Sequence, residues 1–178
     1  MQKDWLKFYK NKEAPTEPSS FAKFIFEKKI PGGTLVDLGC GNGRDTELLN
    51  HRYTAFGVDP FAISDQFANI NNKDWKDTPL GNFDIVYSRF FLHAIPPWEI
   101  SEILKRTPNY FCAECRAVGD KPKLYPEHDR FFVDPKWLFS ELLNHNFEIL
   151  YFAEGHGFAP YKDEDPLVIR VIAKKRNG

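Results

Sequence analysis

The stretch Thr34–Asp45, T-L-V-D-L-G-C-G-N-G-R-D, constrains the fold of this chain more than any other. It begins with a short apolar run typical of a strand that is buried on both faces of a parallel sheet. The run ends in Gly39-x-Gly41-x-Gly43. Glycines at this spacing let the backbone turn sharply and approach a ligand where a Cβ would collide. The stretch therefore predicts a nucleotide-type cofactor at the carboxyl end of the first strand, facing the amides of the next helix.

Two neighbouring residues distinguish between the cofactors that such a loop can hold. The dinucleotide fingerprint is G-x-G-x-x-G, but here its third glycine position is Arg44, and a glycine comes one residue earlier. Asp37 lies inside the strand, where a carboxylate repels a pyrophosphate but suits a cofactor with an ammonium, a sulfonium and no phosphate. A dinucleotide oxidoreductase and a glycine-rich turn without a ligand are the weaker alternatives.

The second predicted strand, 54–59, also ends in an acidic residue, Asp59, which is followed by Pro60. An acidic side chain at this place accepts hydrogen bonds from ribose hydroxyls. The alternative is a turn residue before a proline. Because the distance from the glycine loop is that of one βαβ unit, we predict a ribose contact.

The polar stretch after residue 70 is the weakest part of the pattern. We predict a short third strand over 70–74, in which Asp74 accepts a hydrogen bond from the adenine amino group and Trp75 flanks the ring. The alternative is a polar loop. The fourth strand, predicted over 83–88, is clear and ends at Ser88.

Strands alternate with helices along the rest of the chain. Further strands are predicted over 110–116, 147–153 and 167–174, and helices over 2–12, 20–28, 44–51, 61–71, 96–106 and 135–144. Ser19 or Ser20 is the predicted N-cap of the second helix, and Asp134 with Pro135 that of the last. The last helix is expected to bury Trp137, Leu138, Leu142 and Leu143.

The D-x-G-x-G-x-G pattern of residues 37–43 resembles motif I of the class I S-adenosylmethionine-dependent methyltransferases. With Asp59, the fourth strand and the terminal pair of strands, this resemblance extends over most of the chain. It implies an α/β fold: a Rossmann-like three-layer sheet, mostly parallel, with an antiparallel last strand. It also implies S-adenosylmethionine (SAM) as cofactor and S-adenosylhomocysteine (SAH) as product. The residues expected to contact the cofactor are Tyr9, Asp37, Gly39, Cys40, Gly41, Gly43, Arg44, Asp59, Pro60, Asp74, Trp75 and Ser88.

Four shorter motifs give a finer resemblance. W-x-x-F-Y near the start, S-R-F-F-L-H-A-I, E-H-D-R-F-F and the late G-x-A-x-Y-x-x-E-D-P-x-x-x-R are similar to those of small stand-alone bacterial or viral methyltransferases. Those enzymes are associated with surface-polysaccharide synthesis, which implies a sugar or glycan acceptor. The first 30 residues are expected to form a helical lid, although Trp5 and Tyr9 are equally explained as core aromatics.

Composition bounds the remaining possibilities. A chain of 178 residues with 42% hydrophobic and 28% charged residues predicts a single globular domain, 1–178. The formal net charge of −1 argues against a nucleic-acid partner. The N-terminus has no apolar signal region and no run reaches membrane-spanning length, so we expect a cytoplasmic protein without membrane insertion. A homodimer is possible.

Cys112 and Cys115 form a C-x-x-C pair. They fall in a predicted strand, where residues three apart point to opposite faces. No second cysteine or histidine pair accompanies them. The sequence therefore predicts no metal site.

The acceptor decides whether the chain must supply a base. A sugar hydroxyl needs a general base within hydrogen-bond reach, commonly a histidine. His128 lies in the long connection after the fifth strand and is our first candidate, and His93, just beyond the fourth strand, is the second. The leading hypothesis is O-methylation of a sugar or glycan. The alternatives are N-methylation of a small amine within an aromatic cage, and a partner subunit that binds the cofactor but is inactive.

Overall fold

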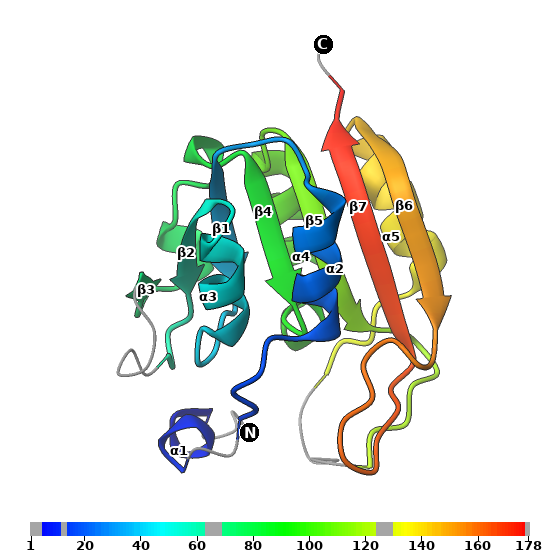
Figure 1. Cartoon of the computed structure of the whole chain (residues 1–178). Coiled ribbons are helices and arrows are strands. Elements are labelled where there is room, and N and C mark those ends of the chain that lie inside the picture. Colours follow the sequence, from blue (N-terminus) through cyan, green and yellow to red (C-terminus); the bar gives the residue numbers. More distant parts are fainter. Residues whose placement is uncertain (1–4, 12–13, 63–68, 124–129, 177–178) are drawn as a thin grey trace.

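The computed structural model describes residues 5–11, 14–62, 69–123 and 130–176, and these fold around one mixed β-sheet (Figure 1). The strands are β1 (Thr34–Leu38), β2 (Thr54–Val58), β3 (Ile70–Asn71), β4 (Ile85–Arg89), β5 (Tyr110–Arg116), β6 (Phe147–Gly155) and β7 (Val168–Lys175). The α-helices are α1 (Trp5–Lys10), α2 (Ser20–Lys28), α3 (Arg44–Asn50), α4 (Pro97–Arg106) and α5 (Pro135–Asn144). The strand order is β3-β2-β1-β4-β5-β7-β6.

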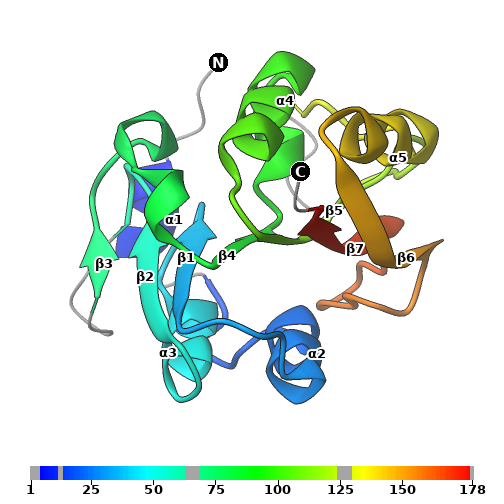
Figure 2. The same ribbon diagram turned by 90° about the horizontal axis from the view of Figure 1, so that it is seen from above.

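The sheet is parallel from β3 to β5, and β7 inserts antiparallel between β5 and β6. Helices α2 and α3 cover one face and α4 and α5 cover the other, so the molecule has three layers (Figure 2). The predicted fold class is confirmed. In the described residues, no helix has both the length and the apolar character that crossing a membrane requires.

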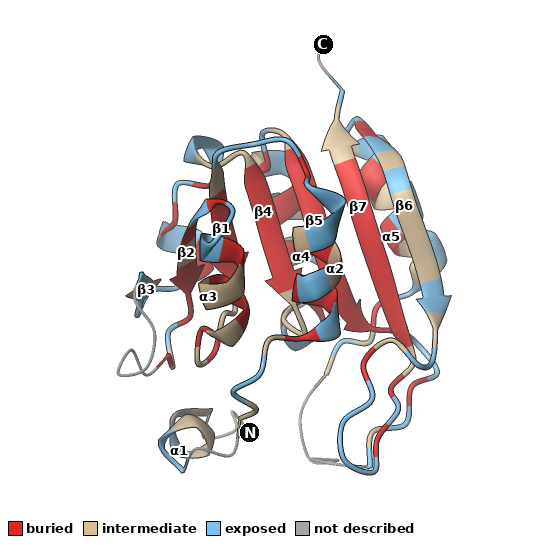
Figure 3. Ribbon diagram, viewed as in Figure 1, coloured by how far each residue is buried: buried red, intermediate tan, exposed pale blue. Residues whose placement is uncertain are grey.

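Alternation along the strands builds two separate cores, one for each face of the sheet. Val36 and Leu38 pack with residues of α4 and α5, whereas Leu35 packs with residues of α2 and α3. Strands β1, β2, β4, β5 and β7 are buried almost throughout, whereas the outer sides of the helices, β6 and the connecting loops reach solvent (Figure 3). In β5, Cys112 belongs to the α2–α3 core and Cys115 to the α4–α5 core. The two thiols therefore lie on opposite faces, as the strand period predicts.

The predicted helix starts are present. Ser19 is the N-cap of α2 and accepts a hydrogen bond from the amide of Ala22. Asp134 is the N-cap of α5 and accepts from the amides of Lys136 and Trp137, with Pro135 as the first helical residue. These starts are set locally, because the cap hydrogen bond joins residues two or three apart.

Three predictions about local structure are wrong. Residues 61–62 and 69–71 are not helical, and 63–68 lie outside the described residues. Strand β3 ends at Asn71, and the chain then forms a 3₁₀ turn, Trp75–Asp77, that Asp74 caps through the amide of Lys76. Leu143 of α5 is 48% exposed. A two-residue strand carries no periodic signal, and the angular width of a buried helix face depends on its neighbours.

One buried carboxylate joins three elements that the sequence pattern treats separately. Asp45, in the first turn of α3, accepts hydrogen bonds from the backbone amide of Ser19 (2.7 Å) and from its hydroxyl (2.6 Å). It also accepts from the hydroxyl of Tyr87 in β4, at 2.8 Å. Asp45 thereby attaches the start of α2 and the first turn of α3 to the central sheet.

We predict that Asp45→Asn destabilises the fold by about 2–4 kcal/mol, because an amide nitrogen then faces hydroxyl donors in a buried site. Urea denaturation followed by circular dichroism measures this change. Tyr87→Phe removes only one of the three hydrogen bonds and is expected to cost about 1 kcal/mol. Equal midpoints for Asp45→Asn and the unmodified chain would show that this carboxylate does not hold the elements together.

Candidate active site

A cavity of about 1320 Å³ opens at the carboxyl ends of the parallel strands. It is lined by the glycine loop after β1, the residues that follow β2 and β4, and the connection between α1 and α2. Helix α1 and the β6–β7 loop lie beyond this edge of the sheet (Figure 1) and also contribute to the lining. In a parallel sheet this edge collects segments that are far apart in sequence, which makes it the natural binding site.

The glycine loop needs the conformations that glycine allows. Gly39, Gly41 and Gly43 have φ angles of 71°, 57° and 81°. A Cβ on Gly39 would lie 2.7 Å from atoms of Phe91, and one on Gly41 would lie 2.6 Å from the Tyr9 hydroxyl. The loop therefore requires glycine for its backbone angles and, at these two places, for close packing.

Asp59, just after β2, holds the glycine loop in place. Its carboxylate accepts from the amide of Gly41 at 3.0 Å and from the amide of Phe61 at 2.8 Å. Burial raises the pKa of Asp59, and these two amide donors oppose that rise. Two oxygens with one amide each retain further lone pairs, so this carboxylate is still able to accept from a ligand hydroxyl.

Asp37 is buried inside β1, and one carboxylate oxygen accepts from the hydroxyl of Thr46 at 2.7 Å. Burial and the neighbouring charge of Asp45 raise the pKa of Asp37 to about 8, against the opposing effect of the Thr46 hydrogen bond. An acidic side chain that retains its proton near neutral pH ionises readily only when a cation arrives beside it.

The structure brings most of the predicted cofactor residues to one cavity. Gly43 and Ser88 do not line it: Gly43 is the N-cap of α3, and Ser88 is fully buried in β4. Among the described residues, the Ser88 hydroxyl has no hydrogen-bond partner. The predicted residues that line the cavity are Tyr9, Asp37, Gly39, Cys40, Gly41, Arg44, Asp59, Pro60, Asp74 and Trp75.

His93 lines the cavity, but its ring is engaged with the backbone. Nδ1 accepts from the amide of Arg116 at 3.2 Å, which places the proton of a neutral ring on Nε2. The carbonyl of His93 accepts from the amide of Phe131. His93 thus holds the connection after β5 against the end of β4, and this tautomer has no lone pair on Nε2 for a proton. His128 lies outside the described residues.

Sequence reasoning missed a row of charges across three strands. Glu114 is fully buried. Its carboxylate accepts from Nε of Arg89 in β4 at 3.0 Å and from Nε of Arg170 in β7 at 2.6 Å. The strand register places the three residues side by side. Arg170 also donates hydrogen bonds to the hydroxyl of Ser20 and the carbonyl of Phe158. The available signal was the charge of Arg89, Glu114 and Arg170 in largely apolar segments, because a buried charge requires a partner.

Comparison with known proteins assigns the fold to a family. A family model described as a methyltransferase domain matches residues 11–119, well over half of the chain. The chain belongs to the methyltransferase-domain family. No curated protein matches it. The matched region contains the glycine loop, Asp37 and Asp59.

Solved structures show the same fold for this methyltransferase domain. The 1,6-didemethyltoxoflavin-N1-methyltransferase of Burkholderia thailandensis is 15% identical, with a TM-score of 0.74 over 98% of this chain and 86% of that one. A SAM-dependent methyltransferase of Archaeoglobus fulgidus is 18% identical, with a TM-score of 0.65 over 97% and 100%. Magnesium protoporphyrin IX methyltransferase of Synechocystis PCC 6803 is 17% identical, with a TM-score of 0.60 over 88% and 76%. These comparisons give no support to a polysaccharide acceptor.

The buried carboxyl of Asp37 gives the methyltransferase domain a pH-dependent stability. A folded-state pKa of about 8 lies above the ordinary value of 3.8, so the folded protein holds this proton more tightly than the unfolded chain does. Its contribution to stability is therefore full below about pH 4 and is lost as the pH rises to about 8.

We predict that Asp37→Asn, which cannot ionise, gains stability relative to the unmodified chain between pH 5 and pH 8, by on the order of 3 kcal/mol. Urea midpoints of the ligand-free protein at these two pH values measure this gain. Parallel pH dependence in the two proteins would contradict the prediction.

Proposed function

We propose that this chain is a SAM-dependent methyltransferase acting on a small-molecule acceptor. The observation that carries the proposal is the cavity in which the glycine loop, Asp37 and Asp59 converge. Membership of the methyltransferase-domain family supports the reaction type. Solved structures of the same fold contain SAM or SAH, which supports the cofactor.

The charge of the site favours this cofactor over a dinucleotide. Asp37 and Asp59 flank the glycine loop, and α3 has Asp45 and Glu47 in its first turn. The charges of Asp59 and of this first turn disfavour a pyrophosphate. Asp37, which is protonated near neutral pH, ionises beside an ammonium but not beside a phosphate. We assign Asp37 to the ammonium group of SAM and Asp59 to its ribose hydroxyls.

We assign Asp74 and Trp75 to the adenine of the cofactor. Both line the cavity, although the indole of Trp75 already donates to Glu99 at 3.3 Å. One oxygen of Asp74 caps the 3₁₀ turn through the amide of Lys76. The second oxygen of Asp74 remains for the adenine amino group.

We propose that α1 covers the cofactor. Its aromatic residues Trp5, Phe8 and Tyr9 line the cavity and pack on one another, with the rings of Trp5 and Tyr9 stacked at 6.2 Å. Tyr9 lies over Gly41. Burial and the nearby Asp59 raise the pKa of its hydroxyl, so Tyr9 stays a neutral hydrogen-bond donor. A lid of this kind excludes water from the reacting atoms.

When bound, SAM supplies a methyl group activated on a sulfonium for in-line displacement. The chain has to hold the acceptor atom in line and remove its proton where that atom is a hydroxyl. Because Nδ1 of His93 is engaged with Arg116, we assign His93 to positioning and keep His128 as the proposed base. Arg130 and Phe131, which closely follow His128 in sequence, line the cavity.

O-methylation of a sugar or glycan hydroxyl is our first candidate reaction. The second candidate, N-methylation of a small amine, is favoured by the aromatic side chains of Phe90, Phe91, Phe131 and Tyr161 in the cavity lining. An aromatic surface stabilises a cationic amine. Isotopically labelled methyl in the product distinguishes the two reactions.

Calorimetric titration with SAH tests the cofactor, with NAD as the control ligand. We expect micromolar SAH affinity and no NAD binding. At pH 7 we expect the release of close to one proton, because an ammonium beside Asp37 lowers its pKa from about 8. Affinity should rise from pH 6 to pH 8. Titrations in buffers of different ionisation enthalpy count the proton.

Asp37→Asn is the matched variant for this titration. It is expected to bind SAH more weakly, with no proton release and a flat pH dependence. Proton release that persists in Asp37→Asn would remove Asp37 from the cofactor site. Binding of neither ligand to the unmodified chain would overturn the assignment of SAM.

A second experiment tests the base. We predict that His128→Ala lowers the turnover of a hydroxyl acceptor by about 100-fold or more, which is the usual contribution of a general base, and leaves SAH affinity unchanged. His51→Ala is the control, since His51 is exposed at the end of α3. Full turnover of a hydroxyl acceptor by His128→Ala would show that His128 is not the base. Product with an amine acceptor in both variants would favour N-methylation.

A further inference from the structure

The cavity is divided by charge. On the side of β1, β2 and the 3₁₀ turn it is lined by the carboxylates of Asp37, Asp59, Asp74 and Glu99. At the start of α3 and at the carboxyl ends of β4 and β5 it is lined by arginines, among them Arg44, Arg89 and Arg116, with the carboxylates of Asp45 and Glu164 beside them. The carboxylate side is the one assigned to the cofactor above. The arginines remain for an anionic group. Arg44 is also among the residues expected to contact the cofactor, which carries a carboxylate of its own.

Arg89 has hydrogen-bonding capacity that the protein does not use. Its Nε donates to Glu114 at 3.0 Å. In the part of the chain that the structure describes, neither of its terminal nitrogens has an acceptor, and the side chain is 17% exposed. A guanidinium with two free nitrogens presents parallel N–H donors, a geometry that matches a carboxylate or a phosphate.

Glu114 does not neutralise Arg89 alone, because it also receives Arg170 at 2.6 Å. Arg116, in contrast, donates to both Asp120 and Glu164 at 2.6 Å. Two cations share one carboxylate in the first group, whereas one cation has two carboxylates in the second. Asp45 also faces Arg89, but it faces Arg44 as well. The guanidiniums of Arg44, Arg89 and Arg170 therefore share two carboxylates, those of Asp45 and Glu114, and positive charge is in excess there.

A second cation, Arg44, lines the same cavity close to Arg89. One terminal nitrogen of Arg44 donates a hydrogen bond to the carbonyl of Glu17 at 2.6 Å, and Nε of Arg44 is 4.0 Å from the carboxylate of Asp45. Asp45 already accepts three hydrogen bonds. Burial and the nearby charge of Arg89 lower the pKa of Arg44. Two guanidiniums that repel each other across a cavity are relieved when an anion lies between them.

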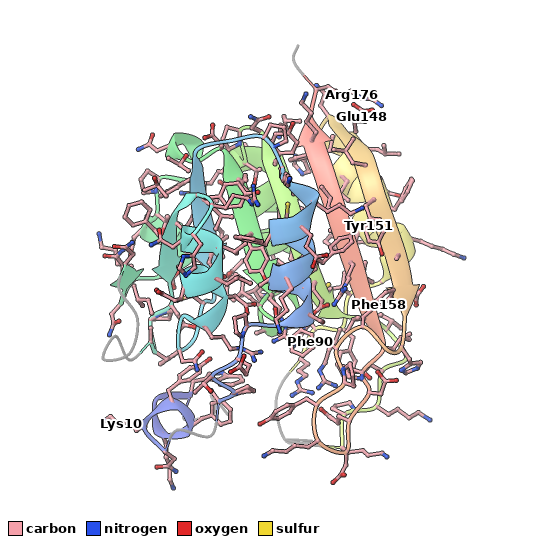
Figure 4. All side chains as sticks on the ribbon, in the orientation of Figure 1. Lys10, Phe90, Glu148, Tyr151, Phe158 and Arg176 are labelled. Carbon is pink, nitrogen blue, oxygen red and sulfur yellow. The ribbon has the colours of Figure 1, made fainter. Side chains whose placement is uncertain are left out.

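The ring of Phe90 packs against the guanidiniums of Arg89 and Arg116. The guanidinium of Arg89 lies 4.2 Å from the centre of its ring, and that of Arg116 lies 5.5 Å away. The backbone of Phe90 has a φ of 56°, unusual for a bulky residue, and its amide donates to the carbonyl of Glu114. Phe90 lies at the carboxyl end of β4 (Figure 4). Strained positions of this kind occur at ligand sites.

We propose that the methyl acceptor carries an acidic group, a carboxylate or a phosphate, that Arg89 binds through its two terminal nitrogens, with Arg44 on the other side of the anion. This inference rests on the proposed methyltransferase function. It makes Arg89 a specificity-determining residue: an acidic acceptor satisfies the free N–H donors, whereas a neutral analogue leaves them unpaired. An apolar ring of the acceptor would rest on Phe90.

Binding of small aromatic probes to the SAH-saturated protein tests this inference without knowledge of the acceptor. Benzoate and phenyl phosphate carry the two acidic groups, and benzamide is the neutral analogue of benzoate. We expect calorimetry to show binding of at least one anion, with benzamide weaker by about tenfold or more. The anion that binds more tightly identifies the acidic group.

Arg89→Gln is expected to weaken the bound anion by about tenfold or more and to leave SAH affinity unchanged. Arg52→Gln is the matched control, because Arg52 is exposed and stacks on Phe26 outside the cavity. Arg89→Lys keeps a cation beside Glu114 and decides the question if Arg89→Gln does not fold. Lysine lacks the planar fork, so we expect a loss of about threefold or more.

Each outcome has one meaning. Equal affinity for benzoate and benzamide, binding of neither anion to the SAH-loaded protein, or undiminished anion binding in Arg89→Gln would overturn the acidic acceptor while the methyltransferase proposal stands. Failure of the unmodified protein to bind SAH would instead overturn the proposed function. Loss of anion binding in Arg52→Gln would show that the probes bind outside the cavity.

Discussion

The parallel pairing of β1 with β2 and β4 is the constraint on which the rest of the structure depends. It places the ends of these strands at one edge of the sheet, and it buries β1 on both faces. A chain that leaves a strand enclosed in this way has to turn at once, and three glycines with positive φ allow it. Asp59 then secures the turn by accepting from the amide of Gly41. The cavity follows from this geometry.

Buried charges connect the outer elements to this central sheet. Asp45 joins α2, α3 and β4 through three hydrogen bonds. Glu114 joins β4 to β7, and Arg170 extends that connection to α2 and the β6–β7 loop. Each of these groups is costly to bury alone and favourable only when its partners are in place. Such networks make the position of each element depend on that of the others, which keeps the cavity walls in register.

The two sides of the cavity have opposite electrostatic character. Carboxylates from β1, the end of β2 and the 3₁₀ turn suit the ammonium and the sulfonium of the cofactor, whereas arginines at α3 and β4 suit an anionic group. This division gives the cofactor and the acceptor separate binding sites within one cavity. Asp37 is held in β1 at a cost to the stability of the ligand-free protein, an arrangement typical of functional sites.

Local patterns in the sequence determined the strands β1, β4 and β5, the caps Ser19 and Asp134, and the glycine loop, because each depends on residues close together in the chain. Of the twelve residues that the sequence predicts at the cofactor, the structure places ten in the lining of one cavity. Only the tertiary structure decided the extent of β3, the burial of Ser88, the tautomer of His93 and the row Arg89–Glu114–Arg170. Each of these depends on strand register and on partners from distant segments, and a single sequence contains no record of which residues meet.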